Sequence, residues 1–111
     1  MNITDKILST LLDNRMSELK KIETILKKHK DYIRKKFYVE KIGVFGSFSK
    51  GEETSESDID ILVKFNGPIG WDVVELNEYL ESVLGKKVDL VSIKALKHQL
   101  KDDILKEVIY V

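Results

Sequence analysis

The feature that most constrains the fold of this chain is a central stretch of mixed acidic and apolar residues, Asp58-Ile59-Asp60-Ile61-Leu62-Val63-Lys64-Phe65. Its β-branched and apolar composition is typical of a β-strand. Residues two apart in a strand point to the same side. The two aspartates should therefore project from one face while the two isoleucines and Val63 enter a core on the other. The sequence predicts a sheet that packs on one face and carries charge on the other.

Helix and strand patterns alternate around this stretch. Apolar residues at helical spacing predict helices near 3–12 and over 17–36, 71–84 and 92–108, the fourth using Leu96, Leu100 and Ile104. Short apolar runs predict further strands over 39–45 and 88–91. Gly85 stands where a left-handed helix cap is expected. We expect an α/β fold in which helices cover a small mixed sheet of three to four strands.

The chain has 111 residues, which is about one domain. We expect an N-terminal helical extension over 1–37 and a single compact unit over 38–111. With 42% hydrophobic and 34% charged residues, a disordered or fibrous chain is excluded. No apolar run approaches a membrane span, and there is no cysteine for a disulfide or a Cys-ligated metal. These features predict a cytoplasmic protein without a membrane partner.

Charge is unevenly distributed although the formal net charge is zero. Residues 1–38 carry an excess of basic groups, whereas residues 39–63 carry an excess of acidic ones. The basic groups of the 17–36 helix form either a solvated face or a surface that steers an acidic partner. Direct nucleic-acid binding is disfavoured by the zero net charge and by the lack of a clustered aromatic platform.

The paired acids Asp58 and Asp60 are the first candidates for chemistry. Two carboxylates side by side raise each other's pKa, and Mg²⁺ resolves the conflict because it prefers carboxylate oxygens and keeps positions open for substrate phosphates. The alternative is that Asp58 only starts the strand and Asp60 faces solvent at a sheet edge. Asp89, within Val88-Asp89-Leu90-Val91, adds a third acid if its strand lies beside the first. Three carboxylates suit a two-metal phosphoryl or nucleotidyl transfer centre. The alternative, if Asp89 is considered alone, is a charged residue on the edge of a sheet.

Gly46-Ser47 follows the 39–45 strand directly and precedes the acid pair by ten residues. Glycine permits a sharp turn and a close approach to phosphate, and Ser47 offers a hydroxyl. His29 and His98 lie on lysine-rich helices and read as surface or boundary residues. Trp71, Tyr79 and Phe65 read as core residues.

Together, Gly46-Ser47, ten intervening residues and Asp58-Ile59-Asp60, followed by Val88-Asp89-Leu90-Val91, resemble the minimal nucleotidyltransferase antitoxins of the polymerase-beta-type nucleotidyltransferase fold. The resemblance covers about residues 40–110. It implies that Asp58, Asp60 and Asp89 hold two Mg²⁺ ions, that Asp89 assists deprotonation of the acceptor, and that Gly46 and Ser47 cradle a triphosphate. Lys50 stands in a loop where many relatives have arginine, and it offers only a point charge to a phosphate.

The resemblance also implies an activity and a partner. The expected enzyme is an ATP-dependent protein adenylyltransferase that acts as an antitoxin by transferring AMP to a hydroxyl, a tyrosine in known examples, of a HEPN-domain ribonuclease toxin, within a hetero-oligomer. The alternative is an antitoxin without catalysis that neutralises the toxin by covering it.

Overall fold

The computed structural model describes residues 17–67, 70 and 72–111. The helix expected near 3–12 and Trp71 lie outside these residues. The described elements run in the order α2 (Glu18–Phe37), β1 (Val39–Phe45), α3 (Ser47–Lys50), β2 (Ile59–Phe65), α4 (Asp72–Leu84), β3 (Val88–Ser92), the 3-10 turn η1 (Ile93–Ala95), α5 (His98–Glu107) and β4 (Ile109–Tyr110).

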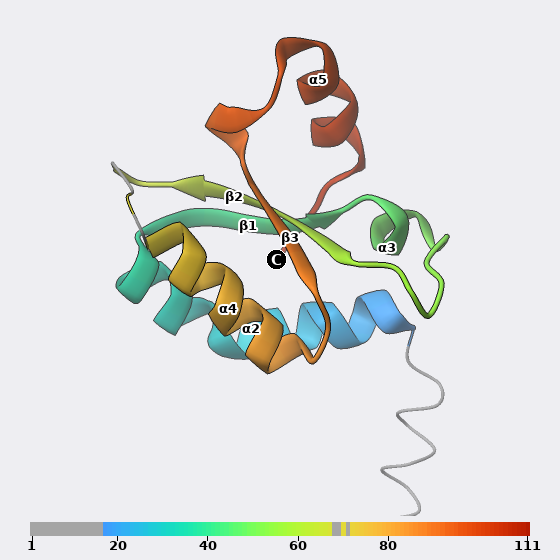
Figure 1. Cartoon of the computed structure of the whole chain (residues 1–111), viewed down its shortest axis with the longest axis horizontal. Coiled ribbons are helices and arrows are strands. Elements are labelled where there is room, and N and C mark those ends of the chain that lie inside the picture. The colour runs from blue at the N-terminus through green and yellow to red at the C-terminus, as the bar shows by residue number, and fades with distance from the viewer. Residues whose placement is uncertain (1–16, 68–69, 71) are drawn as a thin grey trace, which may run out of the picture.

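Four strands form one mixed sheet in the order β3-β2-β1-β4. β1 pairs antiparallel with both β2 and β4, whereas β2 and β3 run parallel. α2 and α4 lie together against one face of this sheet, and α5 stands off the opposite side (Figure 1). The α/β class and the mixed sheet confirm the prediction.

The hydrophobic core lies between the sheet and the α2–α4 layer. Ile59, Ile61 and Val63 of β2 are fully buried there. α2 contributes Ile22, Leu26, Ile33 and Phe37, and α4 contributes Leu76 and Leu80. Because α2 supplies four core side chains, it packs on the same body as the sheet. The division of the chain at residue 37 stays a prediction.

The caps of two helices agree with the sequence. The Ser17 hydroxyl accepts a hydrogen bond from the Lys20 N–H at 3.1 Å and begins α2. Gly85, at φ 70°, ends α4 by donating its N–H to the Glu81 carbonyl at 2.9 Å.

Among residues 17–67, 70 and 72–111, no helix is long and apolar enough to span a bilayer.

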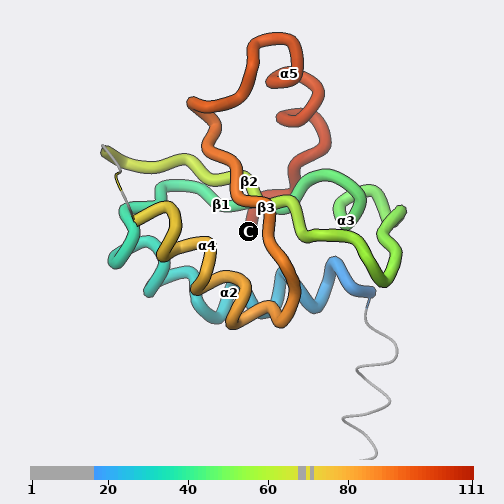
Figure 2. Tube along the Cα trace, viewed as in Figure 1, coloured from blue at the N-terminus to red at the C-terminus, as the bar shows by residue number. Residues whose placement is uncertain are grey.

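The C-terminal part of the chain differs from the prediction. In place of one helix over 92–108, the structure has η1, then α5, then the short strand β4. The N–H of Val111 donates to the Ile42 carbonyl at 2.9 Å, and Ile109 and Tyr110 pair with β1. Pairing with β1 therefore ends the helix at Glu107. The Cα trace in Figure 2 shows the chain leaving the sheet after β3, passing through α5 and returning to the sheet.

Two smaller expectations also need correction. Asp58 was placed in the strand, but β2 begins at Ile59, whose N–H donates to the Lys87 carbonyl at 2.9 Å. The apolar spacing over 71–84 also predicts that Val74 is buried in the core, but Val74 is 51% exposed. The buried side of α4 follows Leu76 and Leu80, which are four residues apart, and Val74 lies off that line.

Candidate active site

Asp60 and Asp89 lie side by side on the sheet face opposite the core. The parallel ladder between β2 and β3 aligns them directly, while their neighbours Ile59 and Val88 point into the core. Strand alternation thus gives both carboxylates the same face. Asp58 is exposed and precedes β2 by one residue, so the ladder does not set its position.

The pKa of Asp60 is raised from 3.8 to about 6. Burial of the carboxyl is the largest cause, followed by the negative charges of Asp89, Asp58 and Glu107, and a side-chain hydrogen bond with Asp89 adds to the effect. All the charges that act on Asp60 are therefore of its own sign. A site of this kind gains from a bound cation.

The acidic residues can supply only part of the ligands that a Mg²⁺ ion needs. In the described part of the chain, no three acidic or histidine side chains converge closely enough to form a complete metal site. The charged groups that raise the pKa of Asp60 are nevertheless all carboxylates. Mg²⁺ is commonly held by one or two carboxylates and completes its octahedron with water and substrate phosphates. The donor set therefore fits an ion that substrate oxygens help to bind.

Gly46 connects β1 to this acidic pair. Its backbone has φ 70° and ψ −148°, a conformation that side-chain-bearing residues rarely adopt. A Cβ atom at this position would collide with the Asp60 carboxylate. Glycine is therefore needed at residue 46 for two reasons, its dihedral angles and its contact with Asp60.

The turn that follows Gly46 is held by its own backbone. The Gly46 carbonyl accepts hydrogen bonds from the Ser49 hydroxyl at 2.8 Å and from the Lys50 N–H at 3.3 Å. Ser47 begins α3 and is half-buried, and its carbonyl accepts the Glu52 N–H at 2.9 Å. Gly46 thus lies next to Asp60, and Ser47 begins the short helix that follows it.

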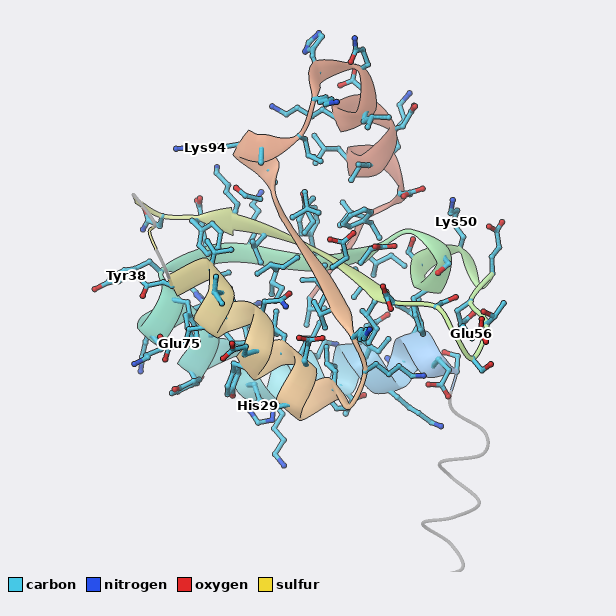
Figure 3. The ribbon with its side chains drawn as sticks, in the orientation of Figure 1. His29, Tyr38, Lys50, Glu56, Glu75 and Lys94 are labelled. Carbon is cyan, nitrogen blue, oxygen red and sulfur yellow. The ribbon has the colours of Figure 1, made fainter. Side chains whose placement is uncertain are left out.

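Sequence reasoning missed one residue of this site, Glu107. Its Oε1 accepts the Gly46 N–H at 3.1 Å, and its Oε2 lies 3.6 Å from the Lys50 Nζ. Figure 3 shows Lys50 on α3. The ammonium group predicted to meet a phosphate is therefore paired with a carboxylate here. The β-branched and aromatic run Val108-Ile109-Tyr110-Val111 was the signal for a strand that would bring Glu107 to this place.

The other singled-out residues lie apart from the acids. His29 Nδ1 and the Tyr79 hydroxyl are 2.8 Å apart and link α2 to α4 on the core side of the sheet. His98 is exposed at the start of α5. Phe65 belongs to the core and Tyr79 packs against it, as predicted.

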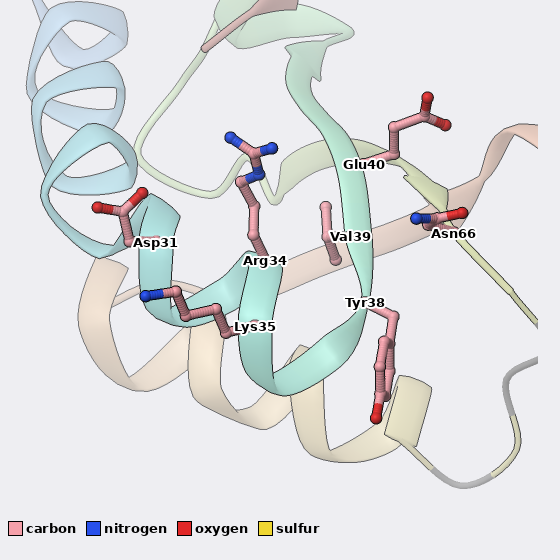
Figure 4. A pocket seen from close by; sticks show the side chains of 7 residues that line it. All are labelled: Asp31, Arg34, Lys35, Tyr38, Val39, Glu40 and Asn66. Carbon is pink, nitrogen blue, oxygen red and sulfur yellow. The ribbon is translucent and has the colours of Figure 1, made fainter.

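A groove of about 440 Å³ lies at the junction of α2, β1 and the end of β2 (Figure 4). It is lined by acidic and basic side chains together, among them Asp31, Arg34, Lys35 and Glu40. None of its lining residues is one of the predicted site residues. The chemistry points to the face that carries Asp60.

Known proteins are similar to this chain in sequence and in overall fold. The chain is 47% identical over 97 residues to the protein adenylyltransferase MntA of Thermococcus cleftensis. The aligned region covers 86% of this chain and 98% of that protein. A solved structure assigned to the minimal nucleotidyltransferases matches with a TM-score of 0.67 and 32% identity, over 86% of this chain and 96% of that one. A chain of a toxin–antitoxin crystal structure with AMP-PNP matches with a TM-score of 0.64 and 29% identity, over 80% and 70%.

The family assignment rests on a match to a family model. The model of the nucleotidyltransferase domain matches residues 26–111, from the middle of α2 through β4. That range includes both sides of the sheet and every predicted site residue. This chain belongs to the nucleotidyltransferase domain family.

Proposed function

We propose that this protein is a Mg²⁺-dependent protein adenylyltransferase that acts as an antitoxin. It transfers AMP from ATP to a tyrosine hydroxyl of a HEPN-domain ribonuclease toxin with which it forms a hetero-oligomer. The similarity to the MntA adenylyltransferase and to the toxin–antitoxin structure with AMP-PNP supports this proposal. The single observation that carries it is the alignment of Asp60 with Asp89 directly beside Gly46.

Each site residue has a distinct role in this proposal. Asp58, Asp60 and Asp89 would hold two Mg²⁺ ions, with substrate phosphate oxygens and water as the remaining ligands, and the bound ions would neutralise charge on the phosphate oxygens. Gly46 and Ser47 receive the triphosphate, because Gly46 leaves room at the backbone next to Asp60. Lys50 contributes a point charge near the same loop.

The reaction needs little from the protein beyond placement and one proton transfer. The acceptor oxygen attacks the α-phosphorus in line, a new oxygen–phosphorus bond forms, and the bond from the α-phosphorus to the bridging oxygen breaks. Pyrophosphate leaves, and Asp89 accepts the proton of the hydroxyl. Asp60 and Asp89, through the Mg²⁺ ions that they would hold, keep the α-phosphate opposite the acceptor, and positioning of this kind supplies much of the rate enhancement.

The acceptor comes from another macromolecule in this proposal. The two core-facing helices cover only one side of the sheet, and Asp58 and Asp89 are exposed on the other. An incoming side chain can therefore reach the acids without passing through this chain's own core. A tyrosine on a flexible segment of the toxin suits such an open site.

Labelled ATP and Mg²⁺, mixed with the purified protein and its toxin partner, test the proposal. When the ATP is labelled at its α-phosphate, we expect the label to be transferred to the toxin. Mass spectrometry should then find added AMP on a tyrosine. Asp60→Asn should abolish transfer, while Asp31→Asn, a change of an exposed acid on α2, should leave it intact.

The same experiment decides between catalysis and simple covering of the toxin. If toxin ribonuclease activity is suppressed equally by the parent and by Asp60→Asn, with no label transferred, the protein neutralises by binding alone. Suppression that requires ATP, Mg²⁺ and Asp60 supports the enzyme.

A further inference from the structure

Glu107 occupies its place because of strand register. β4 pairs with β1 through Gly43 with Tyr110 and Val44 with Ile109. Continuing this antiparallel register by two residues sets Glu107 opposite Gly46. At that point the ladder has ended, and the Glu107 side chain accepts the Gly46 N–H in place of a backbone carbonyl.

Gly46 is thereby held from two sides. Glu107 fixes its N–H, and the Asp60 carboxylate packs against its Cα with no room for a Cβ. The Gly46 carbonyl in turn accepts hydrogen bonds from the Ser49 hydroxyl and the Lys50 N–H. The position of the whole turn relative to Asp60 thus depends on the contact between Gly46 and Glu107.

We infer that Glu107 is a positioning residue for nucleotide binding, which acts by holding the Gly46 turn in register with Asp60. This inference rests on the proposed function, because it concerns the same phosphate loop. Glu107 acts through the Gly46 N–H and touches neither the nucleotide nor the reacting atoms. Its ion pair with Lys50, at 3.6 Å with Lys50 half-exposed, is secondary because exposed pairs contribute little.

The direction in which ATP affinity changes when Glu107 is replaced distinguishes a positioning role from a purely electrostatic one. ATP is an anion, so removing the negative charge of Glu107 should by Coulomb's law alone strengthen ATP binding. A positioning role predicts the opposite result for Glu107→Ala, because the turn loses its anchor. Glu107→Gln removes the charge but keeps an acceptor oxygen for the Gly46 N–H.

Binding of a non-hydrolysable ATP analogue with Mg²⁺ should be measured by calorimetry for these variants. We expect Glu107→Ala to weaken binding about tenfold, the effect of losing a hydrogen bond to a charged group. Glu107→Gln should bind at least as tightly as the parent. Asp103→Ala removes an exposed charge from the same helix and serves as the control for charge alone.

Hydrogen exchange of the Gly46 amide, followed by NMR without nucleotide, gives a second readout. Exchange should be faster in Glu107→Ala and unchanged in Glu107→Gln and Asp103→Ala. Unchanged exchange in Glu107→Ala, or analogue binding as tight as the parent's, would overturn the inference. If the parent itself binds no analogue, the proposed function fails, while the exchange measurement still decides whether Glu107 holds Gly46.

Discussion

The two faces of the sheet are built on opposite principles. On the α2–α4 side, side chains such as Leu26, Ile61 and Leu80 are completely buried. On the other side, α5 has no buried residue and Leu100 is 53% exposed, while Asp60 and Asp89 lie nearby on the strands. The α2–α4 face supplies most of the burial that stabilises the fold, although Leu62, on the same side of β2 as Asp60, is also fully buried. This burial allows the other face to hold mutually repelling carboxylates. The contrast teaches that the acids are tolerated because the stability comes from elsewhere.

The largest expected effect tests the packed face against the open one. Leu80→Ala removes a fully buried side chain and should lower the free energy of unfolding by about 2–5 kcal/mol. Leu100→Ala, on exposed α5, should change it by no more than about 0.5 kcal/mol. Urea denaturation measures both. Similar losses from the two variants would mean that α5 packs as tightly as α4.

The next effect isolates the contact at the border of the two faces. Gly46 and Gly51 both have φ 70°, but only at Gly46 does a Cβ meet another atom, the Asp60 carboxylate. Gly51→Ala should cost about 1 kcal/mol for the backbone conformation, and Gly46→Ala about 2–4 kcal/mol for conformation and collision together. Thermal unfolding gives the difference, and equal costs would remove the Asp60 contact from the account.

A smaller effect concerns the charge on the open face. The folded-state pKa of Asp60, about 6, lies above its ordinary value of 3.8, so the folded protein binds more protons between these values and loses stability as pH rises. Asp60→Asn should therefore raise the Tm at pH 7.5 by a few degrees, and this gain should shrink toward zero near pH 4.

Asp31→Asn is the matched control, because Asp31 is exposed on α2 and away from the acidic cluster. Its difference from the parent should not follow the same pH profile. A gain for Asp60→Asn that is constant from pH 4 to 7.5 would show that Asp60 titrates normally.

The smallest expected effect lies on the outer surface of the packed side. Lys27 and Lys28 are exposed on α2, as the predicted outward-facing basic surface requires. Changing both to Glu should slow association with an acidic partner a few-fold at low salt and leave ATP binding unchanged. Stopped-flow association across ionic strengths measures this. A rate that does not change would leave these lysines as a solvated surface.

Local sequence signals predicted the packed side well. The bounds of β1, Val39–Phe45, agree with the prediction, and as expected α2 begins at Ser17 and α4 ends at Gly85. These features depend on apolar periodicity and capping, which are read from neighbouring residues. The alignment of Asp60 with Asp89 was predicted only conditionally, because it depends on which strands lie side by side.

The open side was harder to predict because long-range pairing decides it. Leu96, Leu100 and Ile104 have helical spacing, yet the chain breaks this pattern into η1, α5 and β4. Pairing of Ile109 with Val44 ends the helix and brings Glu107 to Gly46. The helical pattern over 92–108 does not contain that information; the run Val108-Ile109-Tyr110-Val111 indicates a strand, but not which strand it pairs with, and the contact of Glu107 with Gly46 depends on that pairing.

The parallel alignment of Asp60 with Asp89 also determines where the chain tolerates changes of length. Backbone hydrogen bonds between β2 and β3 fix this alignment, so the number of residues in the connection between the strands does not enter it. Extra residues after Gly85 would be absorbed outside the sheet. Deletion of one residue ahead of Asp89 within β3 would turn its carboxylate into the core and bring an apolar side chain to the acidic face. Insertions and deletions should therefore accumulate in the connections and be absent from Val88–Ser92.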